Sequence, residues 1–333
     1  MNPISEMMAM NNGKDYGQLP QILQDAKTVA IAGHVNPDGD AVSSCLALAL
    51  CMRGIGKSPI VLLEGFSSRF HILPGREMIY QGSYEDVACD AFIALDTSTK
   101  DRLGEAVSVF DRAPLTINID HHISNTLYAR HNFVGEASST AEMVYGVTGQ
   151  FCPMNVDIAA CIYAGLLSDT GGFRHSSTTS ETYSIAARLL ETGMDFSHIY
   201  REVMEMHSIA EVNIMARALS KLTVLPDIGL SYTVLTLQDM REAGADFSDL
   251  DGIVEYMLNI RGVRVSLLVT ERGGDVSKAS LRAVDLNVNQ IAGLFGGGGH
   301  AKAAGATINQ PIGVACEQML AAIREAVQSG GLA

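Results

Sequence analysis

The chain has 333 residues, of which 47% are hydrophobic, and its formal net charge at pH 7 is −14. A chain of this length and composition is expected to form two domains, each with a buried core. The acidic balance argues against dedicated binding of long duplex DNA, because such binding depends on neutralising many phosphates. Short nucleotides are not excluded as partners, since bound divalent cations can supply positive charge locally.

Cysteine spacing and apolar stretches indicate the compartment of the protein. The longest apolar stretch, Ala41 to Met52, is too short to span a bilayer, and the polar N-terminus is unlike a signal peptide. The cysteines form no CxxC motif and have no regular spacing, which is typical of reduced thiols; they are Cys45, Cys51, Cys89, Cys152, Cys161 and Cys316. We therefore expect a soluble, cytoplasmic protein without a membrane partner.

The first half of the chain alternates strand-like runs with helix-like patterns, which is typical of βαβ units and a mainly parallel sheet flanked by helices. The predicted strands cover residues 28–33, 58–63, 91–95 and 115–119. The predicted helices cover residues 41–53, 139–148, 156–168 and 180–192. Gly54 is expected to cap the first of these helices, and Ser139 and Glu142 have the spacing of a capping box.

The second half has a different pattern. A helical periodicity from 195 to 221 predicts a connector, and the segments after it predict a smaller α+β domain. They are a strand at 230–235, a hairpin of 263–269 and 276–284 closed by 272–275, a helix at 286–294, a glycine run at 296–299, a strand near 305–308 and a helix after Pro311. We divide the chain into a first domain of residues 1–192, a connector of 193–222 and a second domain of 223–333.

Polar residues with metal-binding side chains follow four apolar runs of the first half. They are His34 with Asp38 and Asp40, then Asp96, then Asp120-His121-His122, and finally Asp169. An α/β sheet gathers ligands in this way at the carboxyl ends of its strands. Taken singly, these residues have simpler interpretations, since Asp38 or Asp40 would cap the following helix and Asp96 or Asp169 would be a turn residue. Their recurrence favours a metal site.

The number and kind of these side chains predict a dinuclear centre. Carboxylate and imidazole ligands without cysteine suit Mn²⁺, Mg²⁺, Fe²⁺ or Co²⁺ better than a structural Zn²⁺ ion. Two such ions about 3.5–4 Å apart can clamp a phosphoryl group and activate a water for in-line attack. The His-Glu-x-x-His motif of zinc peptidases is absent from the sequence.

The second half contributes two further candidate features. Gly297, Gly298 and Gly299 precede His300, so that backbone N–H groups could approach an anion closely. Lys278, Ser280 and Arg282 alternate along one predicted strand and would form a basic wall on one face. The simpler alternatives are a flexible loop with a surface histidine and a solvated strand face. No P-loop or dinucleotide-binding motif is present.

In this order, the motifs resemble those of the DHH/DHHA1 phosphoesterase superfamily. His34-x-x-x-Asp38-x-Asp40, Asp96, Asp120-His121-His122 and Asp169 are similar to its four N-terminal motifs. Gly296 to His300, followed by Ala303-Ala304-Gly305, are similar to the signature of its C-terminal DHHA1 domain. The size of the chain most resembles the bacterial nanoRNases that also act as 3′-phosphoadenosine 5′-phosphate (pAp) phosphatases.

The resemblance implies a role for each candidate residue. One Mn²⁺ would be held by His34, Asp38 and Asp96, and the other by Asp40, Asp96, His121 and Asp169. His122 would contact the scissile phosphate or assist the leaving group, and Asp120 would orient the site. The far phosphate or nucleotide would be held by the second domain across a cleft, with contacts from Arg282, His300, Gly297, Gly298, Gly299 and Ser280, and from Arg174 and His175 of the first domain.

Four functions are compatible with these residues. The leading one is hydrolysis of short oligonucleotides to mononucleotides together with removal of the 3′-phosphate of pAp. A phosphodiesterase for cyclic or linear dinucleotides would use the same metals, and a non-catalytic nucleotide-binding protein is a further alternative. A family II inorganic pyrophosphatase fits less well, because its C-terminal domain has a different, more basic signature. A homodimer is included among the expected partners.

Overall fold

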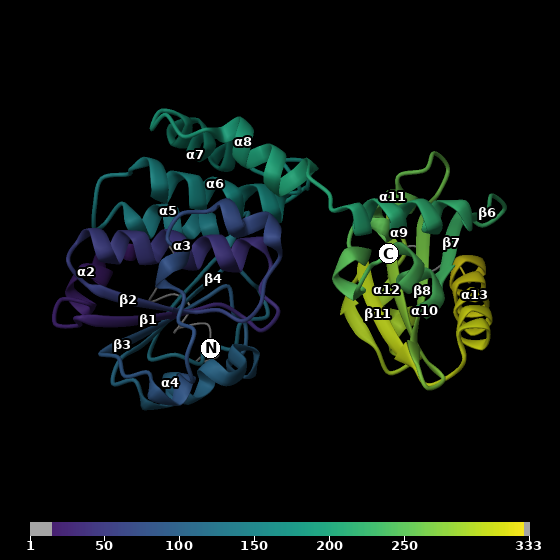
Figure 1. Cartoon of the computed structure of the whole chain (residues 1–333), viewed down its shortest axis with the longest axis horizontal. Coiled ribbons are helices and arrows are strands. Elements are labelled where there is room, and N and C mark those ends of the chain that lie inside the picture. Colours follow the sequence, from purple (N-terminus) through teal and green to yellow (C-terminus); the bar gives the residue numbers. More distant parts are fainter. Residues whose placement is uncertain (1–14, 330–333) are drawn as a thin grey trace, which may run out of the picture. The chain divides into compact units, whose positions relative to one another are not determined.

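The computed structural model describes residues 15–329, and residues 1–14 and 330–333 lie outside the described part. The chain divides into two compact units that meet in sequence between Met206 and His207 (Figure 1). Within the described residues, no helix is both long and apolar enough to cross a membrane.

The first unit contains a five-stranded parallel sheet in the order β2-β1-β3-β4-β5. Its strands are β1 (Thr28–Ala32), β2 (Ser58–Leu62), β3 (Ala91–Leu95), β4 (Thr116–Asp120) and β5 (His131–Val134). The four predicted strands are confirmed to within a residue at either end. β5 was not predicted, because its four residues include two polar ones and show no alternation.

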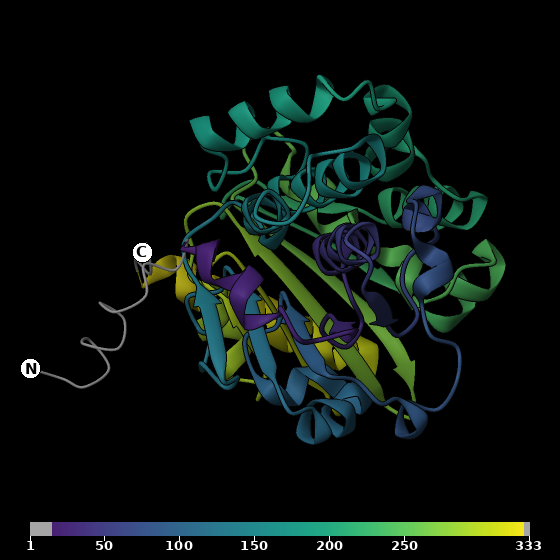
Figure 2. The same ribbon diagram turned by 90° about the vertical axis from the view of Figure 1, so that its left-hand side faces the viewer.

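Helices cover both faces of this sheet. One layer contains α3 (Gly39–Gly54), α5 (Thr140–Thr148) and α6 (Val156–Thr170), with α7 (Ser180–Leu190) beyond them, and the other face carries α4 (Val107–Arg112). Figure 1 and Figure 2 both show this division. The short helix α2 (Leu19–Ile22) precedes β1. The predicted α/β class with helices on both sides of a parallel sheet is confirmed.

Two details at helix ends differ from expectation. Gly54 is the last residue of α3 rather than its cap, and the cap is Ile55. The predicted capping box of α5 forms in a modified way. The Ser139 hydroxyl accepts a hydrogen bond from the Glu142 amide at 3.1 Å, whereas the buried Glu142 carboxylate accepts from the hydroxyls of Ser138 and Thr182 at 2.7 and 2.9 Å.

α3 is buried along almost its whole length, because it lies between the sheet and the helices α5 and α6. A glycine allows this close approach. A Cβ atom on Gly165 of α6 would lie 2.5 Å from the Ala141 Cβ of α5 and 3.0 Å from the Asp40 Oδ1 of α3. Such distances are too short for real contacts, so any side chain at position 165 would push the three helices apart.

The segment predicted as a helical connector is interrupted. It comprises α8 (Phe196–Tyr200), a π-helical turn at Arg201–Glu205, a break at Met206, and α9 (Ile209–Ser220). Ser208 and Glu211 form a capping box that starts α9. A new helix therefore begins where periodicity alone predicted a continuous one, and the predicted domain boundaries stay predictions.

The second unit contains a six-stranded mixed sheet in the order β10-β11-β9-β8-β7-β6, in which only β7 and β8 run parallel. Its strands are β6 (Thr223–Leu225), β7 (Leu230–Leu235), β8 (Val265–Gly273), β9 (Val276–Ala283), β10 (Gly298–His300) and β11 (Ala303–Ile308). The predicted β8–β9 hairpin is confirmed. β6 was not predicted, and β10 arises from the glycine run.

Helices lie on both faces of the second sheet. α12 (Val288–Gly293) and α13 (Ile312–Gln328) pack against one face, over residues such as Leu267 and Leu281. α9, α10 (Leu237–Ala243) and α11 (Ile253–Leu258) enclose a separate core with Leu235 and Leu268. The predicted α+β character of this unit is confirmed, although α10 and α11 were missed because they are short.

Candidate metal centre

The candidate ligands of the first unit lie where strands β1, β3 and β4 end. His34 follows β1, Asp96 directly follows β3, and His121 follows Asp120, the last residue of β4. Because these strands are parallel neighbours, their carboxyl ends meet at one edge of the sheet. Asp169 is an exception to the expected pattern, since it lies in the last turn of helix α6 rather than at the end of a strand.

The first ligand group consists of His34, Asp38 and Asp96. The Nε2 atom of His34 lies 3.6 Å from Oδ2 of Asp38 and 3.7 Å from Oδ2 of Asp96. The Nδ1 atom of His34 is 2.8 Å from the Val35 carbonyl oxygen. Nδ1 therefore carries the proton, which leaves the Nε2 lone pair facing the two carboxylates, as in a metal-binding histidine.

Asp38 serves two purposes that the sequence presented as alternatives. Its Oδ1 atom accepts hydrogen bonds from the amides of Asp40 and Ala41, both at 3.1 Å, and so caps α3. Its Oδ2 atom remains directed toward His34. Capping therefore uses one oxygen of this carboxylate and leaves the other directed toward the first ligand group.

The second ligand group consists of Asp40, His121 and Asp169. The Nε2 atom of His121 lies 3.2 Å from Oδ2 of Asp169 and 3.6 Å from Oδ1 of Asp96, while its Nδ1 faces the Ala137 carbonyl oxygen at 3.3 Å. Asp96 thus stands between the groups, with Oδ2 toward His34 and Oδ1 toward His121. This is the arrangement that a shared, bridging carboxylate requires.

His122 is committed to a different partner. Its Nδ1 donates to Oδ1 of Asp120 at 2.7 Å, and Oδ2 of the same buried carboxylate accepts from Nδ2 of Asn125 at 2.6 Å. The hydrogen bond with Asp120 raises the pKa of His122 to about 9. A charged imidazole at neutral pH is suited to donating a proton or a hydrogen bond.

The carboxylates of the site repel one another. Burial, and then the charges of Asp169, Asp96 and Asp38, hold the pKa of Asp40 well above its usual value. Burial and then the charges of Asp96 and Asp38 raise the pKa of Asp169 to about 8. Buried like charges are costly unless they are paired or coordinate a metal. The oxygen and imidazole donors and the excess of negative charge fit divalent cations.

Two residues of the site were missed by sequence reasoning. Thr140 is fully buried and bonds to both Asp40 and Asp96. Asn125 holds Asp120 and also donates to Oδ1 of Asn118 at 2.7 Å. No local signal marks either residue, because their partners are distant in sequence or depend on how the loop after β4 folds back.

Arg174 and His175 lie on the turn that follows α6. Nε of Arg174 donates to the Gly171 carbonyl oxygen at 2.8 Å, and Nδ1 of His175 is 3.1 Å from the Asp169 carbonyl oxygen. Both side chains are therefore anchored to the backbone next to Asp169. The structure places them beside a metal-ligand candidate, and their substrate contact stays a prediction.

In the second unit, Lys278, Ser280 and Arg282 share one face of β9, since they alternate with buried residues. The polar face predicted from the sequence is confirmed, with Lys278 exposed and the other two half-buried. Arg282 is already engaged: its Nε lies 2.6 Å from Oε1 of Glu255 on α11. Its Nη1 also donates to the Leu281 carbonyl oxygen at 3.1 Å, so the guanidinium group is held on both sides.

The second half of the glycine run, Gly298 and Gly299, lies in strand β10 rather than in the flexible loop considered as its alternative. Gly298 and Gly299 pair with β11, and His300 lies exposed at the end of β10. A Cβ atom on Gly297 would lie 2.2 Å from the Gly305 carbonyl oxygen, and one on Gly299 would lie 2.5 Å from that of Ala303. These glycines allow two backbones to approach. The Gly297 amide donates to Ala292 and is not available to an anion.

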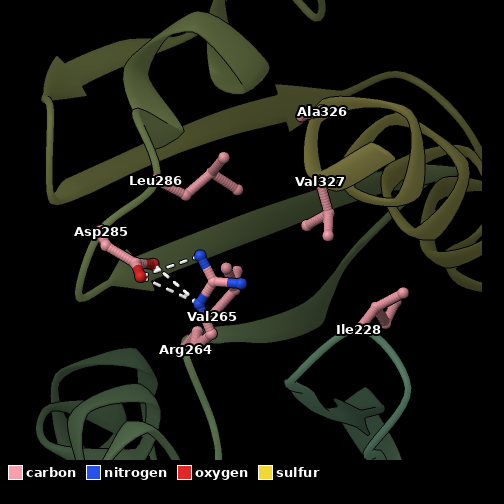
Figure 3. A pocket seen from close by; sticks show the side chains of 7 residues that line it. All are labelled: Ile228, Arg264, Val265, Asp285, Leu286, Ala326 and Val327. Atoms are coloured by element: carbon pink, nitrogen blue, oxygen red, sulfur yellow. Dashed lines mark hydrogen bonds and ion pairs between the residues drawn. The ribbon is translucent and has the colours of Figure 1, made fainter. Parts of the chain in front are cut away.

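A small pocket elsewhere in the second unit is too small for a nucleotide (Figure 3). Its volume is about 30 Å³, which corresponds to a water molecule. Nε of Arg264 lies 2.9 Å from Oδ2 of Asp285 at its edge. The lining residues are Ile228, Arg264, Val265, Asp285, Leu286, Ala326 and Val327. We therefore place the candidate site at the metal centre.

The fold and the site define a two-unit α/β protein with a candidate dinuclear metal centre. Residues 28–166 match the family model described as the DHH family, N-terminal domain, and residues 229–329 match that of the DHHA1 domain. The bifunctional oligoribonuclease and PAP phosphatase NrnA of Thermus thermophilus is 31% identical over 309 residues, which cover 91% of each chain. The chain belongs to the DHH/DHHA1 phosphoesterase superfamily, as the motifs indicated.

Solved structures share the fold of this chain. An exopolyphosphatase-related protein from Bacteroides fragilis has a TM-score of 0.86 and 28% identity, covering 94% of this chain and 96% of its own. RecJ of Thermus thermophilus, in complex with Mn²⁺, has a TM-score of 0.58 and 12% identity, covering 96% of this chain and 55% of its own, and shows a similar fold. The family membership and the NrnA relative of Thermus thermophilus support a hydrolase that acts on phosphoesters.

Proposed function

We propose that the protein is a cytoplasmic, metal-dependent phosphoesterase that hydrolyses short oligonucleotides to mononucleotides and removes the 3′-phosphate of pAp. The observation that carries the proposal is that Asp96 stands between the two ligand groups, with Oδ2 toward His34 of the first and Oδ1 toward His121 of the second. The activities named for the Thermus thermophilus relative support it. In this proposal, residues 1–192 are catalytic, residues 193–222 connect, and residues 223–333 bind substrate.

The proposed ions are two Mn²⁺, with Mg²⁺, Co²⁺ or Fe²⁺ as alternatives of similar ligand preference. His34, Asp38 and Asp96 would hold one, and Asp40, Asp96, His121 and Asp169 the other. Two such ions supply charge neutralisation at a phosphoryl group and a water nucleophile at neutral pH. The protein contributes the fixed lone pairs: the Nε2 atoms of both histidines point toward the carboxylates of the site, because their Nδ1 atoms face carbonyl oxygens.

His122 has a separate role in the proposal. Its protonated ring, held by Asp120, donates a hydrogen bond to a phosphoryl oxygen or to the oxygen of the leaving group. Asp120 fixes the orientation of the ring and keeps it charged, and Asn125 fixes Asp120 in turn. Proton donation is thereby separated from metal binding, which uses other side chains.

The remote end of the substrate is assigned to the second unit. Arg282 and Ser280 on β9, together with His300 and the strand of Gly298 and Gly299, would hold a phosphate or a base, and Arg174 would add a contact from the first unit. Arg282 is the main candidate because a guanidinium group can bind phosphate through two donors at once. Binding energy at this end would position the scissile phosphate.

One panel of substrates tests the proposal. Purified protein with Mn²⁺ is incubated with pAp, a dinucleotide, a trimer, a strand of about 24 nucleotides, cyclic di-AMP and pyrophosphate. We expect pAp and short oligonucleotides of about 2–5 residues to react much faster than the long strand, because an acidic chain cannot neutralise many phosphates. Equal rates per end on the trimer and the long strand would contradict the assignment. Preference for cyclic di-AMP would favour the cyclic dinucleotide alternative.

Metal binding is expected to stabilise the protein in a pH-dependent way. The pKa of Asp169 is raised to about 8, so the free energy of unfolding falls as the pH rises from about 4 toward 8, where the folded protein has to hold a charged Asp169. A divalent cation relieves the repulsion between the carboxylates that raises this pKa. In protein freed of metal by EDTA, added Mn²⁺ should therefore raise the melting temperature more at about pH 8 than at about pH 5.5. Differential scanning fluorimetry checks this, and a larger increase at the lower pH would refute it.

The residues of the second unit are expected to affect substrate binding and not metal binding. Charge-assisted hydrogen bonds contribute roughly 1.5–3 kcal/mol, so Arg282→Ala or His300→Ala should lower kcat/KM on pAp or a dinucleotide about 10- to 100-fold. The loss should be smaller on bis-p-nitrophenyl phosphate, which has no second phosphate. Mn²⁺ stoichiometry should not change. Arg324→Ala, an exposed arginine on α13, is the control. An equal loss on both substrates would contradict the assignment.

A further inference from the structure

Thr140, the first residue of α5, bonds to two candidate metal ligands at once. Its amide donates to Oδ2 of Asp40 at 2.6 Å, and its hydroxyl donates to Oδ1 of Asp96 at 2.9 Å. The amide of Ala141 donates to Oδ1 of Asp40 at 2.9 Å. Thr140 is fully buried, so water cannot take its place as a donor. The start of this helix therefore holds one carboxylate from α3 and one from the residue that follows β3.

The contacts of Thr140 favour one of the two ligand groups. Oδ1 of Asp96, which receives the Thr140 hydroxyl, faces His121 at 3.6 Å, whereas Oδ2 faces His34 at 3.7 Å. Asp40, the other partner of Thr140, belongs to the same group as His121. One hydrogen bond of Thr140 therefore reaches a ligand of the group formed by Asp40, His121 and Asp169, and the other reaches the oxygen of Asp96 that faces His121 of that group.

From this geometry we infer that Thr140 is a positioning residue for the second ion of the proposed centre. The inference rests on the proposed metal-dependent function. A carboxylate can rotate about its Cβ–Cγ bond, and rotation of Asp96 would turn Oδ1 away from His121. The Thr140 hydroxyl occupies one lone pair of Oδ1 and leaves the other for the ion. Groups that orient a metal ligand in this way commonly change metal affinity about 10- to 100-fold when removed.

The hydroxyl can be removed with little effect on the rest of the site. Thr140→Val keeps the shape of the side chain and the backbone amide that binds Asp40, so only the hydrogen bond to Asp96 is lost. Thr148→Val provides a matched control at the other end of α5. Thr148 is also fully buried, but its hydroxyl donates to the Tyr145 carbonyl oxygen at 3.1 Å, away from the ligands.

The test is an electron paramagnetic resonance titration of the metal-free, full-length protein with Mn²⁺, without substrate. We expect two bound Mn²⁺ in the wild type, with the signal of a coupled pair. In Thr140→Val, the first ion should bind as in the wild type, while the second should bind about 10- to 100-fold more weakly and the pair signal should be lost at wild-type saturation. Thr140→Ser restores the hydroxyl and should restore the pair signal, and Thr148→Val should match the wild type.

Three results would overturn the inference. The first is a Mn²⁺ titration of Thr140→Val that is the same as that of the wild type. The second is an equal loss of affinity for both ions in that variant. The third is failure of Thr140→Ser to restore binding of the second ion. If circular dichroism shows that Thr140→Val does not fold, Thr140→Ala, which also keeps the amide, takes its place in the same comparison. Absence of any Mn²⁺ binding by the wild type would instead refute the proposed metal dependence, so the two failures can be told apart.

Discussion

Asp96→Asn is expected to abolish hydrolysis, with a loss of kcat/KM of at least roughly a thousandfold. The reason is that the two oxygens of Asp96 face the histidines of the two ligand groups, so one neutral oxygen and one nitrogen would replace two anionic ligand atoms. The expected loss exceeds the roughly 10²- to 10³-fold cost of removing a single electrostatic contact. Measured kcat/KM on a dinucleotide and Mn²⁺ content by mass spectrometry check this expectation.

Asparagine is the appropriate substitution because of the local backbone. Asp96 has a φ of 56°, in the left-handed region that asparagine tolerates better than most residues. Asparagine also retains an acceptor for the Thr140 hydroxyl. Asp111→Asn, on the exposed end of α4, is the control. A variant that lacks Asp96 but keeps two Mn²⁺ and wild-type turnover would refute the shared role of this carboxylate.

His122→Asn is expected to lower kcat/KM by about 10²- to 10⁴-fold, the range typical of a lost general acid, while bound Mn²⁺ stays unchanged. The ring is committed to Asp120 through Nδ1, so its removal deletes a proton donor and leaves the ligand groups intact. The activity of the wild type should fall as the pH rises through an apparent pKa of about 9 or lower, because bound cations lower the pKa of His122, which is about 9 without them. The variant should lack this alkaline limb.

The leaving group of the substrate distinguishes the two roles proposed for His122. If the ring protonates the departing oxygen, the loss of kcat/KM in His122→Asn should become smaller along a series of aryl phosphodiesters with increasingly good leaving groups. If the ring instead binds a phosphoryl oxygen, the loss should be constant across the series. His198→Asn, a half-exposed histidine on α8, is the control. Loss of an ion from His122→Asn would place this side chain among the ligands and contradict the separation of roles.

The sequence predicted much of the first unit because its signals are local. β1, β3 and β4 are apolar runs that stop at Asp or His, and parallel pairing brings such ends together without further information. The family signature also contains the candidate ligands. Asp169 follows the predicted helix 156–168, which the structure confirms as α6, but the expectation that Asp169 stands at the end of a strand was wrong, because it lies in the last turn of that helix.

The remaining features depend on contacts between distant residues. β10 forms only because β11 approaches Gly297 and Gly299 closely. Glycine composition alone is equally compatible with a flexible loop. The bonds from Thr140 reach residues 44 and 100 positions away in sequence. Short helices such as α10 and α11 contain too few turns for a clear periodicity. Local patterns therefore identified the ligands, and packing determined what supports them.

The close contact at Gly165 gives the helical layer a direct part in the geometry of the centre. Asp169 is one turn further along the same helix, while Asp40 lies on the helix that Gly165 allows to come near. The separation of these two carboxylates is consequently fixed by a position that has no side chain. The distance between two candidate ligands therefore depends partly on the absence of a Cβ atom at position 165. A comparison of related sequences that considers only the ligand residues would miss this glycine.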